Sequence, residues 1–252
     1  MPTAYVHFGQ VTQQLTYYPD GNVQGVTDGN GNQVVLSNWK RGIPQLIRFP
    51  ATPDAPAGAT QSAVVNDNGW IVQATDENGF ATGYQYDAMG RISQVNYPGG
   101  DAVAWNATRL DLARLSGTEQ GLAAGHWRHT TRTGTGTKVV YMDALWRPVL
   151  ADTFDSSNPA ETRSMVRTAF DHAGREVFTS YPAETANTTK GVTTTYDALG
   201  RALTTTSDSE LGPLVTTREY LDGFTTRTTT ANGQQTSTRY LAWDKPLEDF
   251  PT

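Results

Sequence analysis

The chain alternates between short strand-like runs and turn residues along most of its length. Turn glycines recur at steps of 10 and 11 residues, first at Gly21, Gly31 and Gly42 and later in an equivalent set that ends at Gly90. Among the glycines toward the C-terminus, at 200, 212, 223 and 233, lie Thr-rich runs such as residues 225–230. Thr favours strands while tolerating water on one face. Strands and turns at about 8–12-residue spacing predict an all-β meander of antiparallel hairpins.

One six-residue box recurs in three places and reads aromatic-Asp-x-x-Gly-Arg, which marks a repeat protein. Asp at the first turn position can accept a hydrogen bond from the backbone N–H two residues on. Gly three residues later fits the last position of a type I turn or the left-handed residue of a turn plus bulge. We therefore predict that the box is a structural hairpin corner. The box residues are Tyr86, Asp87, Gly90 and Arg91; Phe170, Asp171, Gly174 and Arg175; and Tyr196, Asp197, Gly200 and Arg201.

The rhythm is interrupted twice, at about residues 50–62 and 101–165. The first interruption is Pro-rich, and Pro removes the N–H that strand pairing needs. In the second, Leu110 and Leu112 favour a strand, although periodicity over so few residues leaves a short helix open. Residues 155–161 combine capping residues with Pro and predict a single helical turn. Residues 141–148 are expected to be a degenerate box, with Met after Tyr and Trp in the place of Gly.

The composition excludes several classes of function but does not identify one. The net charge of −6 gives no electrostatic footprint for nucleic acid, and no apolar run is long enough to span a bilayer. There are no cysteines, so disulfides and thiolate metal sites are excluded. No linker or shift in composition divides the sequence, and the N-terminus shows no signal peptide. We expect one elongated domain over residues 1–252, with at most one or two short helical turns.

The repeated Tyr/Phe-Asp-x-x-Gly-Arg box, in a turn-punctuated and Thr-rich β chain, resembles the RHS or YD-repeat family. The resemblance covers roughly residues 12–245. It implies a curved strip of hairpins that spirals into a hollow shell, of which this chain would be a part. Relatives include bacterial polymorphic toxins, the encapsulating component of insecticidal toxin complexes, and teneurins. In the toxins the shell encloses a variable C-terminal toxin domain. The Asp-Pro-x-x-Gly motif tied to self-cleavage in family shells is absent from this sequence.

The residues that could bind a ligand or a metal are better explained by structural roles. His126 and His129 are three apart, but on a strand residues three apart face opposite sides. Residues 28–32 resemble the start of an EF-hand loop, but Gln33 and Lys40 stand where that loop requires Gly and Glu. The aromatic residues suit sheet packing, including Tyr beside Arg in cation–π contact. We therefore expect no catalytic, metal or cofactor-binding residues.

The leading hypothesis is a non-enzymatic structural module of a secreted or cell-surface bacterial protein. It would be a segment of an RHS/YD-repeat shell that encapsulates or displays a toxin or effector domain. Its partners would be the remaining shell repeats and the C-terminal effector of a larger protein, and its unpaired strand edges invite self-association. One alternative is a carbohydrate-binding or adhesive surface module with cell-surface glycans as partners. A weaker alternative is a hydrolase that uses the turn carboxylates.

Overall fold

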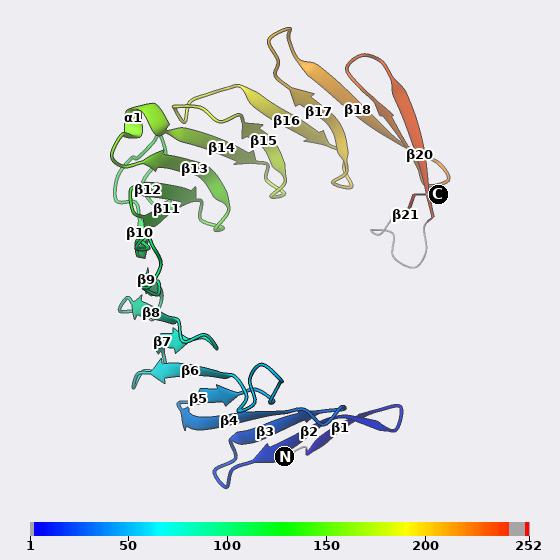
Figure 1. The fold of residues 1–252 in the computed structure, drawn as a ribbon. Helices are drawn as coiled ribbons and strands as arrows, with labels where there is room; N and C mark the ends of the chain where they lie inside the picture. Colours follow the sequence, from blue (N-terminus) through cyan, green and yellow to red (C-terminus); the bar gives the residue numbers. More distant parts are fainter. Residues whose placement is uncertain (1–2, 242–249, 252) are drawn as a thin grey trace. The chain divides into compact units, whose positions relative to one another are not determined.

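The computed structural model describes residues 3–241 and 250–251, which fall into two compact units, residues 1–110 and 111–252. Within these described residues, every regular element is a β-strand except for one helical turn (Figure 1). The strand pairings in these residues are antiparallel and join strands that follow one another in the chain. The prediction of a repetitive antiparallel hairpin meander is confirmed. The single elongated domain stays a prediction.

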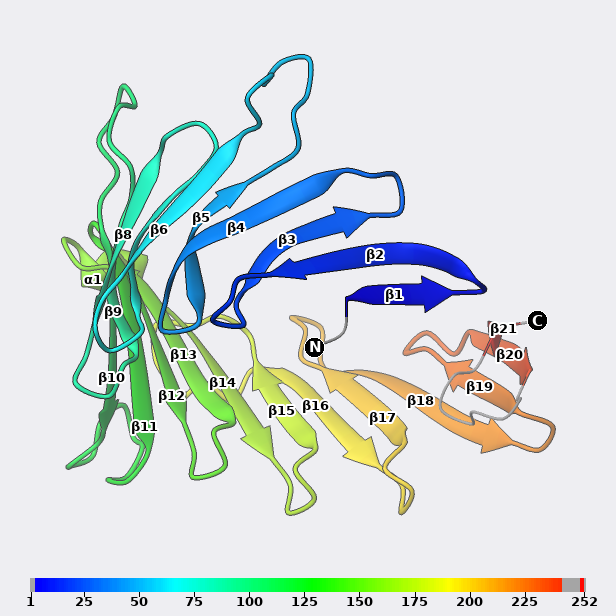
Figure 2. The same cartoon turned by 90° about the horizontal axis from the view of Figure 1, so that it is seen from below.

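The first unit is a meander in which each strand lies beside its neighbours in sequence (Figure 2). Strand β10 pairs with β9 and continues into the second unit. The strands are β1 (Ala4–His7), β2 (Gln10–Tyr17), β3 (Val23–Asp28), β4 (Gln33–Lys40), β5 (Ile43–Arg48), β6 (Thr60–Val65), β7 (Ile71–Thr75), β8 (Ala81–Tyr86), β9 (Ile92–Asn96) and β10 (Thr108–Arg114).

The second unit continues the same pattern from β11 to β21, with the helical turn α1 between β13 and β14. Its elements are β11 (Trp127–Thr133), β12 (Gly136–Met142), β13 (Pro148–Asp155), α1 (Pro159–Thr162), β14 (Ser164–Phe170), β15 (Glu176–Ser180), β16 (Gly191–Tyr196), β17 (Ala202–Ser207), β18 (Leu214–Leu221), β19 (Thr225–Thr229), β20 (Gln235–Leu241) and β21 (Phe250–Pro251).

Nine hairpin corners in the described residues share one five-residue geometry. The first residue donates its N–H to the carbonyl of the fifth, and the fourth donates its N–H to the carbonyl of the first. The fourth residue has a positive φ in every case and is Gly in all but one. This is a type I turn followed by a left-handed residue, as the box predicted. The corners begin at Tyr18, Asp28, Asn66, Asp76, Asp87, Asp143, Asp171, Asp197 and Thr230.

Glycine at the fourth position has a second role where a corner lies beside the preceding corner on the same edge. A Cβ added at Gly90 would lie 2.8 Å from Cζ2 of Trp70, which is the fifth residue of the preceding corner on that edge. At Gly174 and Gly200 the nearest atoms instead belong to the preceding Arg side chains, at 3.6 and 3.8 Å. At Gly79 nothing lies within 4 Å. The glycine therefore provides both a positive φ and room for a neighbouring side chain.

The irregular segments are narrower than the sequence suggested. Strand β6 begins at Thr60, so the Pro-rich loop ends before residue 60. Strands β10 to β13 occupy much of residues 101–165, and Leu110 and Leu112 lie on β10, which settles the choice between strand and helix. The helical turn predicted at residues 155–161 is present as α1, with Asn158 as its N-cap and Pro159 at its first position. The Asn158 side chain makes no capping hydrogen bond.

The two units bury their side chains differently. Among the described residues of the first unit, Val65 is the one nearly fully buried large hydrophobic residue. The second unit has a local core on one face of β12 to β14, where loop residues Leu122 and Ala186 cover it. The core is therefore built where two loops, residues 115–126 and 181–190, lie over the sheet. Its buried members are Leu115, Val139, Tyr141, Leu150 and Met165.

We predict that Gly90→Ala destabilises the chain more than Gly79→Ala. Both substitutions place a Cβ on a residue at positive φ, +80° and +85°, which costs about 1–2 kcal/mol. Only the first also drives that Cβ into Trp70, and overpacking of this kind adds about 1–3 kcal/mol. Urea unfolding followed by circular dichroism measures both variants. Equal losses would contradict a packing role for Gly90.

Candidate functional site

The three predicted boxes each form a corner in which the Asp carboxylate is fully engaged. In the corner at Asp171, Oδ1 accepts hydrogen bonds from the N–H groups of Ala173 and Arg175, both at 2.9 Å. Its Oδ2 accepts a 2.7 Å bond from Nε of Arg175. Asp87 and Asp197 repeat this arrangement with the same 2.7 Å contact to Arg Nε. The Asp and Arg of each box therefore bind one another and the turn backbone.

These contacts lower the carboxyl pKa values in all three boxes. For Asp87, Asp171 and Asp197 the largest cause is the backbone hydrogen bond from the Arg of the same corner, and the Arg side chain lowers the pKa further. A general base works best with a pKa near the operating pH. Carboxylates held below their ordinary pKa, with both oxygens occupied, are poorly suited to that role. The geometry thus favours turn building over proton transfer.

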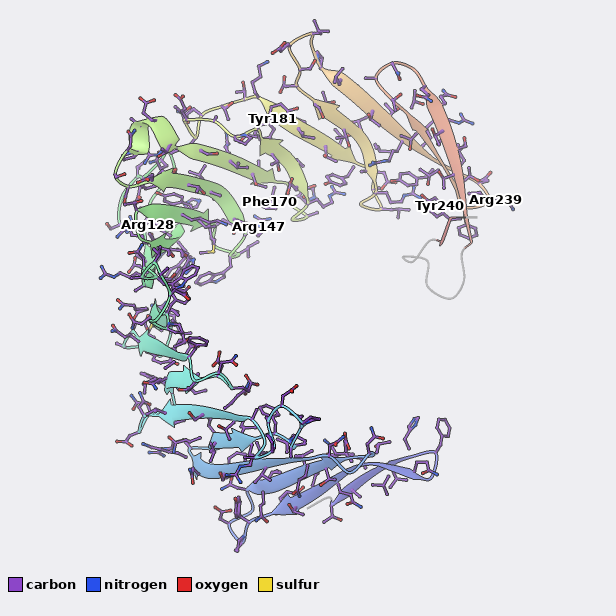
Figure 3. All side chains as sticks on the ribbon, in the orientation of Figure 1. Arg128, Arg147, Phe170, Tyr181, Arg239 and Tyr240 are labelled. Atoms are coloured by element: carbon purple, nitrogen blue, oxygen red, sulfur yellow. The ribbon has the colours of Figure 1, made fainter. Side chains whose placement is uncertain are left out.

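Each corner Arg of the second unit also reaches the next hairpin corner on the same edge. The guanidinium carbon of Arg175 lies 4.8 Å from the ring centre of Tyr196, and that of Arg201 lies 4.1 Å from the ring of Tyr220. Arg147 and Phe170, both labelled in Figure 3, make the same contact at 4.6 Å. The predicted Tyr–Arg cation–π contact is confirmed, but it joins successive corners rather than residues of one box.

The tyrosine hydroxyls add a hydrogen bond to the same junctions. Tyr196 donates to the carbonyl of Glu176 at 2.7 Å, and Tyr220 donates to the carbonyl of Ala202 at 3.0 Å. In the first unit Tyr86 donates to the carbonyl of Ile71 at 2.6 Å and contacts the Trp70 ring. Burial raises the pKa of Tyr86, so its hydroxyl stays protonated as a donor. The box aromatic therefore ties each corner to the preceding one.

One corner differs from its sequence interpretation. The degenerate box was expected to have Met142 inserted after Tyr141, but the register pairs Met142 with Pro148, so Met142 itself occupies the aromatic position. Asp143 and Arg147 then make the usual contacts, with Nε 2.7 Å from Oδ2. Trp146 takes the glycine position at φ +62° and stacks on Trp127. The intact Asp-to-Arg spacing of four residues was the signal for this corner.

A second group of polar residues lies beneath the loops that cover the local core. Glu119 accepts hydrogen bonds from the Tyr141 hydroxyl at 2.7 Å and from Arg128 at 2.9 and 3.1 Å. Burial is the main reason that the pKa of Tyr141 is raised far above its ordinary value. These contacts anchor the loop that carries Leu122 over the core. Sequence reasoning missed this group because its members are far apart in the chain.

Asp152 is the most buried carboxylate of that region, with 2% of its side chain exposed. Its Oδ1 lies 3.2 Å from Nε of Arg163, yet the two atoms do not meet in hydrogen-bond geometry. Burial raises the pKa of Asp152, and the nearby Arg163 opposes that shift. Arg163 also stacks on the ring of Phe154. The pair is a partly compensated buried ion pair on a sheet face and not an acid–base pair facing solvent.

The other sequence candidates lie apart from these groups. His126 precedes β11 and contacts the carbonyl of Ala123, whereas His129 lies on the strand. Asp28 begins an ordinary corner, as the failed EF-hand match suggested. Across the described residues, no group of three or more His, Cys, Asp or Glu side chains is arranged to hold a metal ion. In the same residues, no helix has the length and apolarity to cross a membrane.

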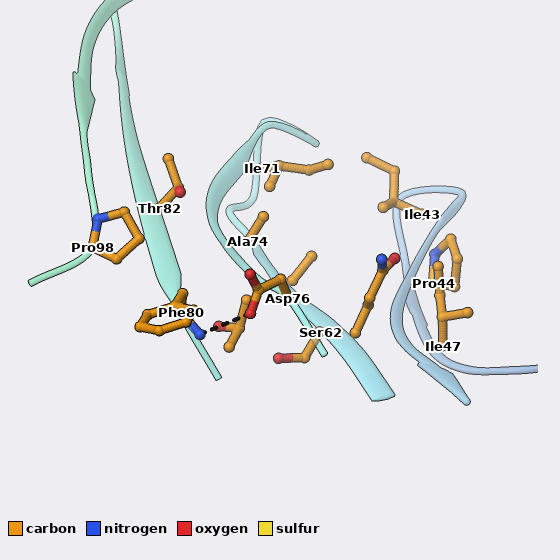
Figure 4. Close-up of a pocket in the computed structure, with 13 residues that line it drawn as sticks. Ile43, Pro44, Ile47, Ser62, Ile71, Ala74, Asp76, Phe80, Thr82 and Pro98 are labelled. Carbon is orange, nitrogen blue, oxygen red and sulfur yellow. Dashed lines mark hydrogen bonds between the residues drawn. The ribbon is translucent and has the colours of Figure 1, made fainter. Parts of the chain in front are cut away.

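An open groove of about 390 Å³ lies on the first unit (Figure 4). Its lining is mainly apolar. The Asp76 carboxylate in this lining accepts hydrogen bonds from the N–H groups of Asn78 and Phe80. The groove therefore offers shape and apolar contact rather than reactive groups. It is lined by Ile43, Pro44, Ile47, Gln61, Ser62, Ala63, Ile71, Ala74, Thr75, Asp76, Phe80, Thr82 and Pro98.

We predict that Asp171→Asn destabilises the chain near neutral pH and that the difference from wild type shrinks in acid. Asn keeps the oxygen that accepts the two backbone N–H groups but loses the ion pair with Arg175. Because folding lowers the pKa of Asp171, its stabilising effect is complete above the ordinary carboxyl pKa. It is lost as the pH falls through the lowered value. Urea unfolding at a series of pH values measures this.

Asp111→Asn, on an exposed position of β10, is the matched control. Because the Asp111 position is exposed, this variant should unfold with nearly the wild-type free energy near neutral pH. A constant difference between Asp171→Asn and wild type down to strongly acidic pH would contradict an ionised Asp171 in the corner.

Comparison with known proteins agrees with this repeated architecture. Residues 65–102 match the family model of the RHS Repeat. Teneurin-4 of Mus musculus is 27% identical over 115 residues, and teneurin-1 of Gallus gallus is 23% identical over 117 residues. These alignments cover 39% and 40% of this chain but 4% of each teneurin.

Solved structures share the fold over nearly the whole chain. The crystal structure of TcdB2-TccC3-TEV matches with a TM-score of 0.62 and 15% identity, over 92% of this chain and 13% of that chain. TcdB2-TccC3 without its hypervariable C-terminal region matches with a TM-score of 0.61 and 12% identity, over 96% and 14%. The chain thus spans a small part of its relatives. With its recurring corner and its RHS Repeat match over residues 65–102, the chain is similar to proteins of the RHS/YD-repeat family.

Proposed function

We propose that this chain is a non-enzymatic wall segment of a larger RHS/YD-repeat shell. The observation that carries the proposal is that the recurring side chains of the box bind one another and the neighbouring corners. Each box Asp binds its own turn and its own Arg, and the box Arg residues of the second unit reach the next corner. The acidic and basic groups that a hydrolase would need are therefore committed to holding hairpins together.

The wall would enclose or display an effector domain of the parent protein. Support comes from the relatives that share the fold, one of which is described as TcdB2-TccC3 without its hypervariable C-terminal region. A wall built from repeated hairpins suits this role because its length is set by the number of repeats. In this proposal the partners are further repeats of the same wall and a C-terminal toxin or effector. The parent would be a secreted or cell-surface bacterial protein.

A carbohydrate-binding or adhesive module is the alternative. Such a module needs coplanar aromatic rings that are free to stack on sugars. Trp146 is 52% exposed but stacks on Trp127 with an interplanar angle of 18°, so one of its faces is occupied. Several box aromatics lie against an Arg side chain or, for Tyr86, against Trp70. The ring contacts favour the wall over the sugar platform.

We predict that removing residues 164–207 from the full-length parent exposes its C-terminal domain to protease. This deletion removes β14 to β17, two complete hairpins, and leaves the alternation of strand direction intact. The C-terminal domain should resist protease in the intact protein and be cut rapidly after the deletion. A flexible insertion in the loop at residues 208–213 is the control, since it lengthens a turn without opening the wall.

Two results would contradict the enclosing wall. One is that the C-terminal domain resists protease with and without the two hairpins. The other is that this domain is cut rapidly in both proteins. Calorimetric titration of the chain with oligosaccharides addresses the alternative. Saturable binding there, together with unchanged protease resistance, would favour the adhesive module.

A further inference from the structure

The third residue of the corner varies in polarity from one corner to another. It is Asn in the corners that begin at Asp28, Asn66, Asp76 and Thr230, but Met or Leu in three others. The apolar residues are largely exposed, at 78% for Met89, 70% for Leu145 and 78% for Leu199. Because the same corner forms with Asn at this position, the corner itself does not require an apolar side chain. The exposed apolar tips therefore need another explanation.

In the second unit these tips lie along one edge of the sheet. The corners that join β12 to β13, β14 to β15, β16 to β17 and β18 to β19 lie on the same edge (Figure 2). Successive corners on one edge are two strands apart, or about 10 Å. We call their tips the apolar rim: Leu145, Ala173, Leu199 and Phe224, the last 62% exposed.

The apolar rim is electrically neutral at three of its four corners. Asp143, Asp171 and Asp197 are each paired with the Arg of the same corner. Two such rims would therefore meet without strong like-charge repulsion. The opposite edge differs, because it carries the loop of residues 181–190 and the polar corner at Thr230. Leu211, fully exposed on that opposite edge, provides a matched apolar residue outside the rim.

We propose that the apolar rim binds a second copy of itself. A partner with the same strand spacing presents side chains at the same interval of about 10 Å, which an unrelated surface would match only by chance. The rim can also pair with itself about a two-fold axis. A two-fold axis between the corners at Asp171 and Asp197 sets Leu199 opposite Ala173 and Phe224 opposite Leu145, in an isologous contact.

A second observation also favours a rim of the same kind as the binding partner. The related solved chains are about seven times longer than this segment, since the match covers 13% of one of them. In a long wall many such rims are available, and weak contacts repeated along it reinforce one another. The proposal does not require that the parent protein enclose an effector.

The first test is self-association of the purified chain by sedimentation velocity over a range of concentrations. The wild type and Leu211→Asn should dimerise with the same affinity. The double variant Leu145→Asn/Leu199→Asn should dimerise at least about tenfold more weakly. Asn is already present at this corner position in four other corners, so the variant should keep the circular dichroism spectrum and urea transition of the wild type.

The absence of cysteines from the chain allows a second test. The double variant Ala173→Cys/Leu199→Cys should form a disulfide-linked dimer quickly on mild oxidation, whereas Leu211→Cys should not. A monomeric wild type at every concentration would overturn the proposal, as would equal weakening by the rim and Leu211 variants. Dimerisation that Val6→Pro in β1 abolishes and the rim variant leaves intact would also overturn it, in favour of strand-edge pairing.

Discussion

The structure depends on the hydrogen bonds that close each hairpin corner. In the corner at Asp171, one carboxylate binds two backbone N–H groups and the Arg175 side chain. An exposed ion pair alone contributes little, about 0–1 kcal/mol. Here the same carboxylate also satisfies turn N–H groups that strand pairing leaves free, and charge-assisted hydrogen bonds are stronger than neutral ones. A sheet with few buried side chains must obtain order from such local contacts.

The corners also stabilise one another, and the chemistry of that contact varies. Arg lies on the ring of the next corner in the second unit, as for Arg175 and Tyr196, whereas the first unit uses Trp70 on Tyr86. Both pairs place a flat group against an aromatic face, and both keep the tyrosine hydroxyl bonded to a carbonyl. What is conserved between repeats is therefore a stacking position rather than a particular residue. The glycine beside it supplies the space.

Sequence reasoning found the features that are local and missed those that join distant segments. The box predicted the turn type, the Asp hydrogen bond and the positive φ because all three arise within five residues. The corner at Asp143 was misassigned because Trp146 replaces the expected glycine, although its Asp-to-Arg spacing was intact. That the corner Arg residues of the second unit stack on the next corner could not be deduced, since it depends on which corners share an edge.

The local core of the second unit shows what happens where the series of corners is interrupted. Between the corners at Asp87 and Asp143 the chain makes no corner of the shared type in the described residues. There the loop of residues 115–126 folds over β12 to β14, and its Glu119 is held by Tyr141 and Arg128. Burial of apolar side chains replaces the missing corner contacts. The sheet thus combines two sources of order, repeated polar corners along its edge and a covered apolar face where the repeat fails.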